Sequence, residues 1–128
     1  MNLDKSVTLT IDGKQYILKY NIQSLMTLEN IISTRNILKM VNSYPFSHTD
    51  TVACLFIGLQ ENHPGITQKK AIRLLEKWLD NNSMTELGNL IMIALAKAGA
   101  IGYTQKNNED DAELKEEKEE KKSKASAK

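Results

Sequence analysis

The chain has 128 residues, of which 41% are hydrophobic and 26% charged, and its formal net charge is +1. This balance predicts one globular domain and excludes the strong positive excess that is typical of a nucleic-acid binder. The single cysteine, Cys54, excludes an intramolecular disulfide and suits a reducing cytoplasm.

The apolar runs in the sequence are too short for a membrane protein. The most apolar run, VACLFIGL, is far shorter than the roughly 20 residues that span a bilayer. The first residues also lack the long apolar core of a signal peptide. We therefore expect a cytoplasmic protein without a membrane or nucleic-acid partner.

A β-hairpin is the first element that the sequence predicts, within residues 6–20. Apolar and polar residues alternate on both sides of Asp12 and Gly13, a pair that suits the positive φ angles of a two-residue hairpin turn. We expect one face to cover the core, and its members are Val7, Leu9, Ile11, Tyr16, Leu18 and Tyr20. Because two strands alone are marginally stable, the hairpin must pack on helices or extend a partner's sheet.

Helical spacing begins after Asn21, which can cap a first helix. The core stripe of that helix is Leu25, Leu28 and Ile32. We expect a break at residues 33–36, where helix-weakening residues gather, and then a short second helix. Pro45 marks the next loop, and Asp50 is expected to cap a third helix over residues 51–62.

Two more helices are predicted downstream. Residues 68–81 follow Thr67 as a cap and carry an apolar stripe of Ala71, Leu74, Leu75, Trp78 and Leu79. Ser83 and Glu86 form a capping box for the last helix, which Gly99 ends.

The stretch ENHPGIT joins the third and fourth predicted helices. Pro64 presets φ at the first central position of a type II turn, and Gly65 accepts the positive φ of the second. We interpret the stretch as a structural joint. His63 is then an exposed or half-exposed turn residue close to a helix-end carbonyl.

The predicted fold class is α+β. Residues 1–103 are expected to form a single domain, in which the N-terminal hairpin precedes a small bundle of four to five helices. Residues 104–128 contain seven lysines, eight acidic residues and one leucine. We expect this segment to be a charged, flexible, disordered tail, because it cannot bury enough surface to offset its ordering entropy.

No catalytic, cofactor or metal site is predicted. His48 and His63 are the only histidines, and a zinc site would need further ligands at suitable spacing. Cys54 lies within an apolar run, which favours a buried apolar role over that of a nucleophile. Since the chain also lacks the common catalytic and phosphate-binding motifs, we expect a binding module and not an enzyme.

The last predicted helix is apolar over much of its circumference, which favours burial in the domain or between subunits. A candidate partner or self-association surface, with the spacing of helix-in-groove anchors, comprises Leu87, Leu90, Ile91 and Leu95. The spacing fits a role in the core equally well, so both alternatives stay open.

Two ordered segments carry a family resemblance, TLTIDGKQYILKYNIQSLMTLE and LFIGLQENHPGITQKKAIRLLEKWL, and a capped apolar helix and a charged tail follow them. This order resembles the tail assembly chaperones of long-tailed bacteriophages and prophages of Gram-positive hosts. The matching stretches are residues 7–29 and 55–79, and with the last helix the resemblance covers most of residues 7–99.

The resemblance implies a non-enzymatic role. Such chaperones bind the long helical tape-measure protein, keep its apolar segments soluble and help to bring tail-tube subunits to it. It also implies self-association, action in the host cytoplasm and absence from the mature virion.

Three alternatives remain from the residues themselves. Two short helices around a glycine-containing turn suggest a small DNA-binding regulator, against which the near-neutral charge argues. A generic oligomeric scaffold fits the apolar helices. A small hydrolase would have to use His63, and we expect no such activity.

Overall fold

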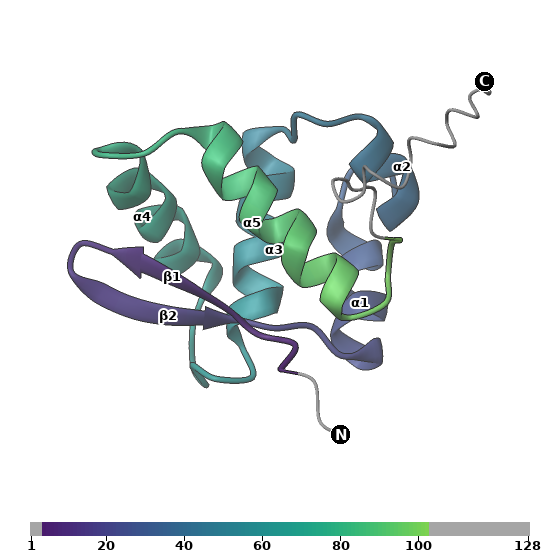
Figure 1. The fold of residues 1–128 in the computed structure, drawn as a ribbon, viewed down its shortest axis with the longest axis horizontal. Helices are drawn as coiled ribbons and strands as arrows, with labels where there is room; N and C mark the ends of the chain where they lie inside the picture. The colour runs from purple at the N-terminus through teal and green to yellow at the C-terminus, as the bar shows by residue number, and fades with distance from the viewer. Residues whose placement is uncertain (1–3, 103–128) are drawn as a thin grey trace, which may run out of the picture.

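The computed structural model describes residues 4–102 of the chain. Its elements in chain order are β1 (Val7–Ile11), β2 (Lys14–Leu18), α1 (Ile22–Ile31), α2 (Ile37–Asn42), α3 (His48–Leu59), α4 (Gln68–Leu79) and α5 (Met84–Lys97). The hairpin and α4 lie at one side of the molecule, α1 and α2 at the other, and α3 and α5 between them (Figure 1). This arrangement confirms the predicted α+β fold. The predicted tail, residues 104–128, lies outside the described residues.

The hairpin has the predicted turn and the predicted buried face. Asp12 and Gly13 adopt φ angles of +54° and +77°, as a two-residue type I′ turn requires. The antiparallel register pairs Leu9 with Tyr16. The buried members of the expected face are Val7, Leu9, Ile11, Leu18 and Tyr20, whereas Tyr16 is only half-buried.

Most helix ends follow the local sequence signals. Asn21 and Ser83 each form a capping box at the start of their helix. The hydroxyl of Thr67 accepts a hydrogen bond of 3.0 Å from the N–H of Lys70 and so caps α4. Gly99, with a φ of +83°, follows the last residues of α5. These signals act within four residues, which is why the sequence alone could place them.

Asp50 is not the cap of α3, contrary to the expectation. The hydroxyl of Ser47 accepts from the N–H of Asp50 at 3.0 Å, so α3 begins at His48, and it ends at Leu59. The Asp50 carboxylate is buried and accepts from the N–H and the hydroxyl of Ser33, at 3.0 and 2.9 Å. Asp50 therefore connects α3 to the segment that follows α1. Its partner there, Ser33, is 17 positions away in the sequence.

The central helix α3 is enclosed by the other elements, since nine of its 12 residues are buried. It packs against β2, α1, α4 and α5. At its centre the Tyr20 hydroxyl donates a hydrogen bond of 2.7 Å to the carbonyl of Cys54. Gly58 lies beside the same tyrosine, and the absence of a side chain there lets the hairpin approach the helix closely.

Replacing Gly58 by alanine should destabilise the domain. A Cβ at Gly58 would lie 2.5 Å from Leu18 Cδ1 and 2.8 Å from the ring of Tyr20. We expect the clash to cost about 1–3 kcal/mol of unfolding free energy. Denaturant unfolding followed by circular dichroism measures this change.

The matched control is Gly102→Ala, since a Cβ there meets no atom within 4 Å. Alanine in a helix is normally about 1 kcal/mol more favourable than glycine. A Gly58→Ala protein as stable as the wild type, or more stable, would therefore contradict the close contact.

Candidate interaction surfaces

The joint between α3 and α4 has the predicted turn. Ile66 N–H donates to the His63 carbonyl at 3.2 Å, and Gly65 between them has a φ of +87°. Pro64 and Gly65 therefore occupy the central positions of a type II turn, as the sequence indicated.

His63 has a more definite role than the sequence predicted. Its Nε2 accepts a hydrogen bond of 2.8 Å from the N–H of Ile17, and its ring lies 5.3 Å from the ring of Tyr16. The expected contact with a helix-end carbonyl is also present, since the N–H of His63 donates to the carbonyl of Leu59, the last residue of α3, at 2.9 Å. The ring adds a contact with strand β2 that the sequence did not predict.

Directly after that strand, the N–H of Lys19 donates to the carbonyl of Gly58 in α3 at 2.9 Å. The His63 ring and the Gly58 carbonyl thus accept from the backbone N–H groups of Ile17 and Lys19 along the outer edge of the hairpin.

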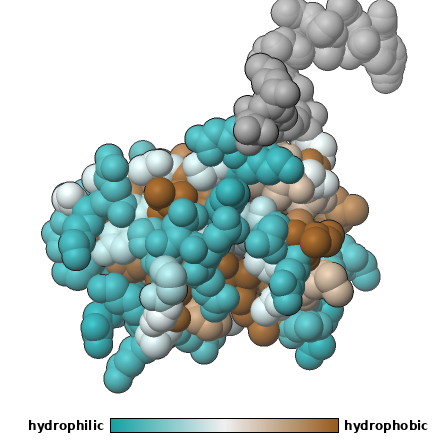
Figure 2. Space-filling view, turned by 90° about the horizontal axis from the view of Figure 1, so that it is seen from below, coloured by the Kyte–Doolittle hydropathy of each residue, from teal (hydrophilic) through white to brown (hydrophobic). Residues whose placement is uncertain are grey.

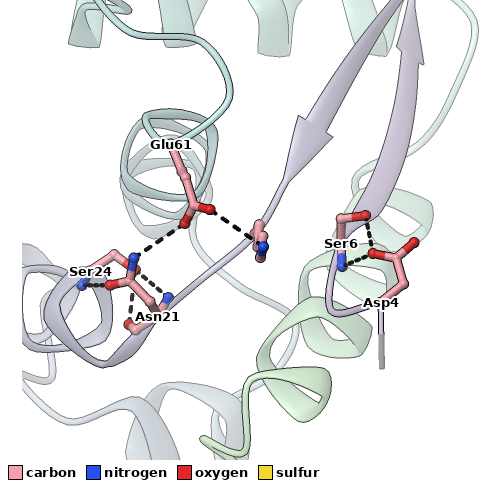
Figure 3. Close-up of polar contacts among 6 residues, drawn as sticks. Asp4, Ser6, Asn21, Ser24 and Glu61 are labelled. Atoms are coloured by element: carbon pink, nitrogen blue, oxygen red, sulfur yellow. Dashed lines mark hydrogen bonds and ion pairs between the residues drawn. The ribbon is translucent and has the colours of Figure 1, made fainter. Parts of the chain in front are cut away.

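A polar cluster connects the end of α3 with the start of α1 (Figure 3). The carboxylate of Glu61 accepts from the Asn21 side-chain amide at 3.2 Å and lies 3.4 Å from Lys19 Nζ. Both charged side chains are well exposed, so the ion pair contributes at most about 1 kcal/mol. The cluster borders a polar hollow of about 330 Å³. Its residues orient one another and supply no nucleophile with an adjacent base.

A second polar contact in Figure 3 involves Asp4 and Ser6. The Asp4 carboxylate accepts from the hydroxyl and the N–H of Ser6, at 2.6 and 2.9 Å. These hydrogen bonds lower the pKa of Asp4, because they favour the ionised carboxylate. The contact is exposed and lies directly before the first residue of β1.

Cys54 is a buried core residue, as predicted. Its side chain has no exposed surface, and its Sγ lies 3.9 Å from Met40 Sδ. Burial, and then the charge of Asp50, raises the pKa of the Cys54 thiol to about 12. The thiol is therefore protonated at neutral pH and a poor nucleophile.

Clusters of metal ligands and membrane-spanning helices are both absent from residues 4–102. Among residues 4–102, no three His, Cys, Asp or Glu side chains lie close enough together to hold a metal ion. No helix in this part of the chain combines the length and the apolar character needed to cross a membrane.

The candidate surface on α5 is divided between core and exterior. Leu87, Ile91 and Leu95 have no exposed area and fill the core, which is one of the two alternatives that their spacing left open. Leu90 is half-buried. The tight packing of this helix includes Gly88, where a Cβ would lie 2.7 Å from the ring of Tyr44.

Exposed apolar side chains gather instead on α1 and α2. Ile22, Met26 and Leu38 are 74%, 62% and 55% exposed, and we call this surface the α1–α2 face. They border a hollow of about 210 Å³ whose apolar lining also includes Leu25 and Ile37. Figure 2 shows apolar side chains on the right-hand side of the molecule, where Figure 1 places α1 and α2.

The sequence carries a signal for this face, although the face was not predicted. Ile22 and Met26 are four residues apart and form a second stripe on α1, beside the core stripe. Composition alone does not tell which of two apolar stripes is buried.

No protein-family model, curated protein or solved structure matches this chain. Function must therefore be inferred from the chain's own residues and surfaces.

Replacing His63 by alanine should loosen the hairpin. The substitution removes the acceptor of the Ile17 N–H and the ring contact with Tyr16. We expect a loss of about 1–2 kcal/mol and faster hydrogen exchange at the Ile17 amide, measured by NMR. His48→Ala, at the exposed histidine of α3, is the control. Unchanged exchange at Ile17 would contradict the assigned role of His63.

Cys54 should resist thiol reagents while the protein is folded. With a pKa of about 12, roughly one thiol in ten thousand is ionised at pH 8, and burial blocks access to it. Labelling by a chromogenic disulfide reagent should be complete in guanidinium chloride and slower by orders of magnitude in native buffer. Rapid native labelling would show that α3 opens readily.

Proposed function

We propose that this protein is a tail assembly chaperone of a long-tailed bacteriophage or prophage of a Gram-positive host. It binds the tape-measure protein, keeps that protein soluble and helps to recruit tail-tube subunits during tail assembly. It acts in the host cytoplasm by binding and not by catalysis, associates with copies of itself, and is absent from the mature virion. The order of the hairpin, joint and capped-helix segments supports this assignment, through its resemblance to that family.

The structural observation that supports the proposal is the exposed apolar side chains of the α1–α2 face. Residues 22–42 include only three charged residues, Glu29, Arg35 and Lys39, in a chain that is 26% charged. Glu29 is already engaged, since its carboxylate accepts from the Ile37 N–H at 3.0 Å. Surfaces that are depleted of charge and rich in aliphatic side chains are typical of interface cores.

An apolar helical segment of a client fits this face. Covering Ile22, Met26 and Leu38 removes apolar area from water, which stabilises a complex by roughly 1–2 kcal/mol for each such partly exposed side chain. The same face shields the client's apolar residues, which would otherwise aggregate.

The test is co-expression with the tape-measure protein encoded beside this gene. We expect the wild-type chaperone to increase the soluble fraction of that protein, and Met26→Glu to remove most of the increase. Gln23→Glu adds the same charge at an exposed position of α1 without removing an apolar side chain, so it should act as the wild type does. A soluble fraction that does not change when both proteins are well expressed would overturn the proposal.

A further inference from the structure

Helix α4 lies on the side of the molecule away from the α1–α2 face (Figure 1), and a second apolar surface is found there, in the hollow between α3 and α4. The hollow has a volume of about 330 Å³, and Val52 and Leu75 form its buried floor. Ile72 and Leu79 stand on its lip, 46% and 39% exposed, although the sequence placed Leu79 on the core stripe. These two side chains give α4 an apolar area that no other part of residues 4–102 covers.

A stripe of four charged side chains borders this hollow. Lys69 and Arg73 carry positive charge, and Glu76 and Asp80 follow with negative charge. Spacings of three and four residues place all of them on one side of α4, and all of them are exposed. Glu76 itself lines the hollow, and the cap residue Asp80 keeps helical backbone angles. We call these four residues the charged stripe.

The order of charges in the charged stripe is unfavourable for α4 alone. Lys69 in the first turn and Asp80 at the C-cap oppose the helix dipole, which favours negative charge at the N-terminus and positive charge at the C-terminus. Lys69 and Arg73 are like charges four residues apart, and so are Glu76 and Asp80. Within residues 4–102, no member of the charged stripe takes part in an ion pair. A second stripe with the opposite order of charges would therefore stabilise the helix.

A second copy of this chain carries that complementary stripe when it is turned end for end. A two-fold axis perpendicular to α4 makes the two α4 helices antiparallel and brings the same side of each helix together. The register that sets Arg73 opposite Glu76 of the second copy is centred midway between these two positions. The same point lies midway between Lys69 and Asp80, so these residues also meet across the pair. Because symmetry repeats each contact, the two stripes are complementary along their whole length.

The apolar side chains fit the same register. Ile72 of one copy lies opposite the space between Leu75 and Leu79 of the other, which is where the hollow opens. Helix α4 has 12 residues, and the lining of the hollow includes both of its ends, Gln68 and Leu79. One apolar ridge and one hollow thus fit each other twice, as an isologous contact requires.

The other exposed apolar side chains of the chain match α4 less well. Helix α1 exposes Ile22 and Met26 but carries Glu29 as its single charged residue, so it complements only the positive half of the charged stripe. The exposed Leu38 belongs to α2, which has six residues and spans less than two turns. Helix α5 exposes Ile93 alone among its large apolar side chains. Among the described residues, α4 is therefore the surface that complements α4 in both charge and shape.

We propose that two copies of this chain associate through α4 as an antiparallel, two-fold symmetric pair, in which Ile72 of each copy enters the hollow of the other and Arg73 pairs with Glu76. The inference rests on the proposed function in one respect, self-association, to which it assigns a surface and a geometry. The α1–α2 face lies on the other side of each copy and stays uncovered in such a pair.

The experiment is sedimentation equilibrium of the purified 128-residue chain. We expect an average mass that rises with concentration from 14.4 kDa towards twice that value, with a dissociation constant of tens to hundreds of micromolar, because the contact is small. Arg73→Glu and Glu76→Arg should each weaken the dimer about tenfold, because each change sets like charges opposite one another twice. An equimolar mixture of the two variants should restore dimerisation, because their stripes again complement each other.

Apolar variants test the hollow. Ile72→Asn should weaken the dimer, whereas Leu38→Asn, which removes a similarly exposed aliphatic side chain from α2, should dimerise as the wild type does. The proposal is overturned by a mass of 14.4 kDa at every concentration up to about 1 mM, by equal weakening in the two asparagine variants, or by charge variants that stay monomeric when mixed. A chain that dimerises through α4 without solubilising the tape-measure protein contradicts the chaperone assignment alone. A monomer that solubilises that protein contradicts this inference alone.

Discussion

Tyr20 and Leu18 lie directly against α3 at Gly58, because no side chain separates them from the helix. The hydroxyl of Tyr20 satisfies the Cys54 carbonyl, and the carbonyl of Gly58 accepts from the N–H of Lys19. A two-stranded hairpin has little stability of its own, so this contact is what makes it part of the domain. The joint after α3 adds a further hydrogen bond through His63.

Helix α3 packs against β2, α1, α4 and α5, so its position affects the burial of these four elements. Since the helix is enclosed, α1, α4 and α5 each present an apolar stripe to it or to the hairpin on it. Helix α5 is covered so fully that Leu87, Ile91 and Leu95 have no exposed surface. The exposed large apolar residues lie on the outer sides of α1, α2 and α4, and Ile93 adds one on α5. These exposed side chains, and not the buried stripe of α5, form the apolar surface of the domain.

The exposed apolar surfaces of the domain differ in chemistry. The α1–α2 face is almost free of charge and suits apolar segments with little sequence selectivity. The hollow between α3 and α4, about 330 Å³ in volume, combines the aliphatic side chains of Ile72, Leu75 and Leu79 with the carboxylate of Glu76.

Local sequence alone determined the turns and most of the helix ends. Asp12 and Gly13, Pro64 and Gly65, and the caps Asn21, Thr67 and Ser83 are read from residues within four positions, because turn φ angles and capping hydrogen bonds are local. Alternation and helical spacing likewise determined the α+β class and most of the core.

Tertiary structure decided what depends on distant residues. Ser33 and Asp50 meet across 17 positions, and Ile17 and His63 across 46, so neither contact has a local signal. The same holds for the candidate surfaces, since Ile22 and Leu25 are equally apolar and only the packing of α1 on α3 buries one and exposes the other. Sequence periodicity shows that a helix has apolar stripes, but burial is a property of the neighbours that cover them.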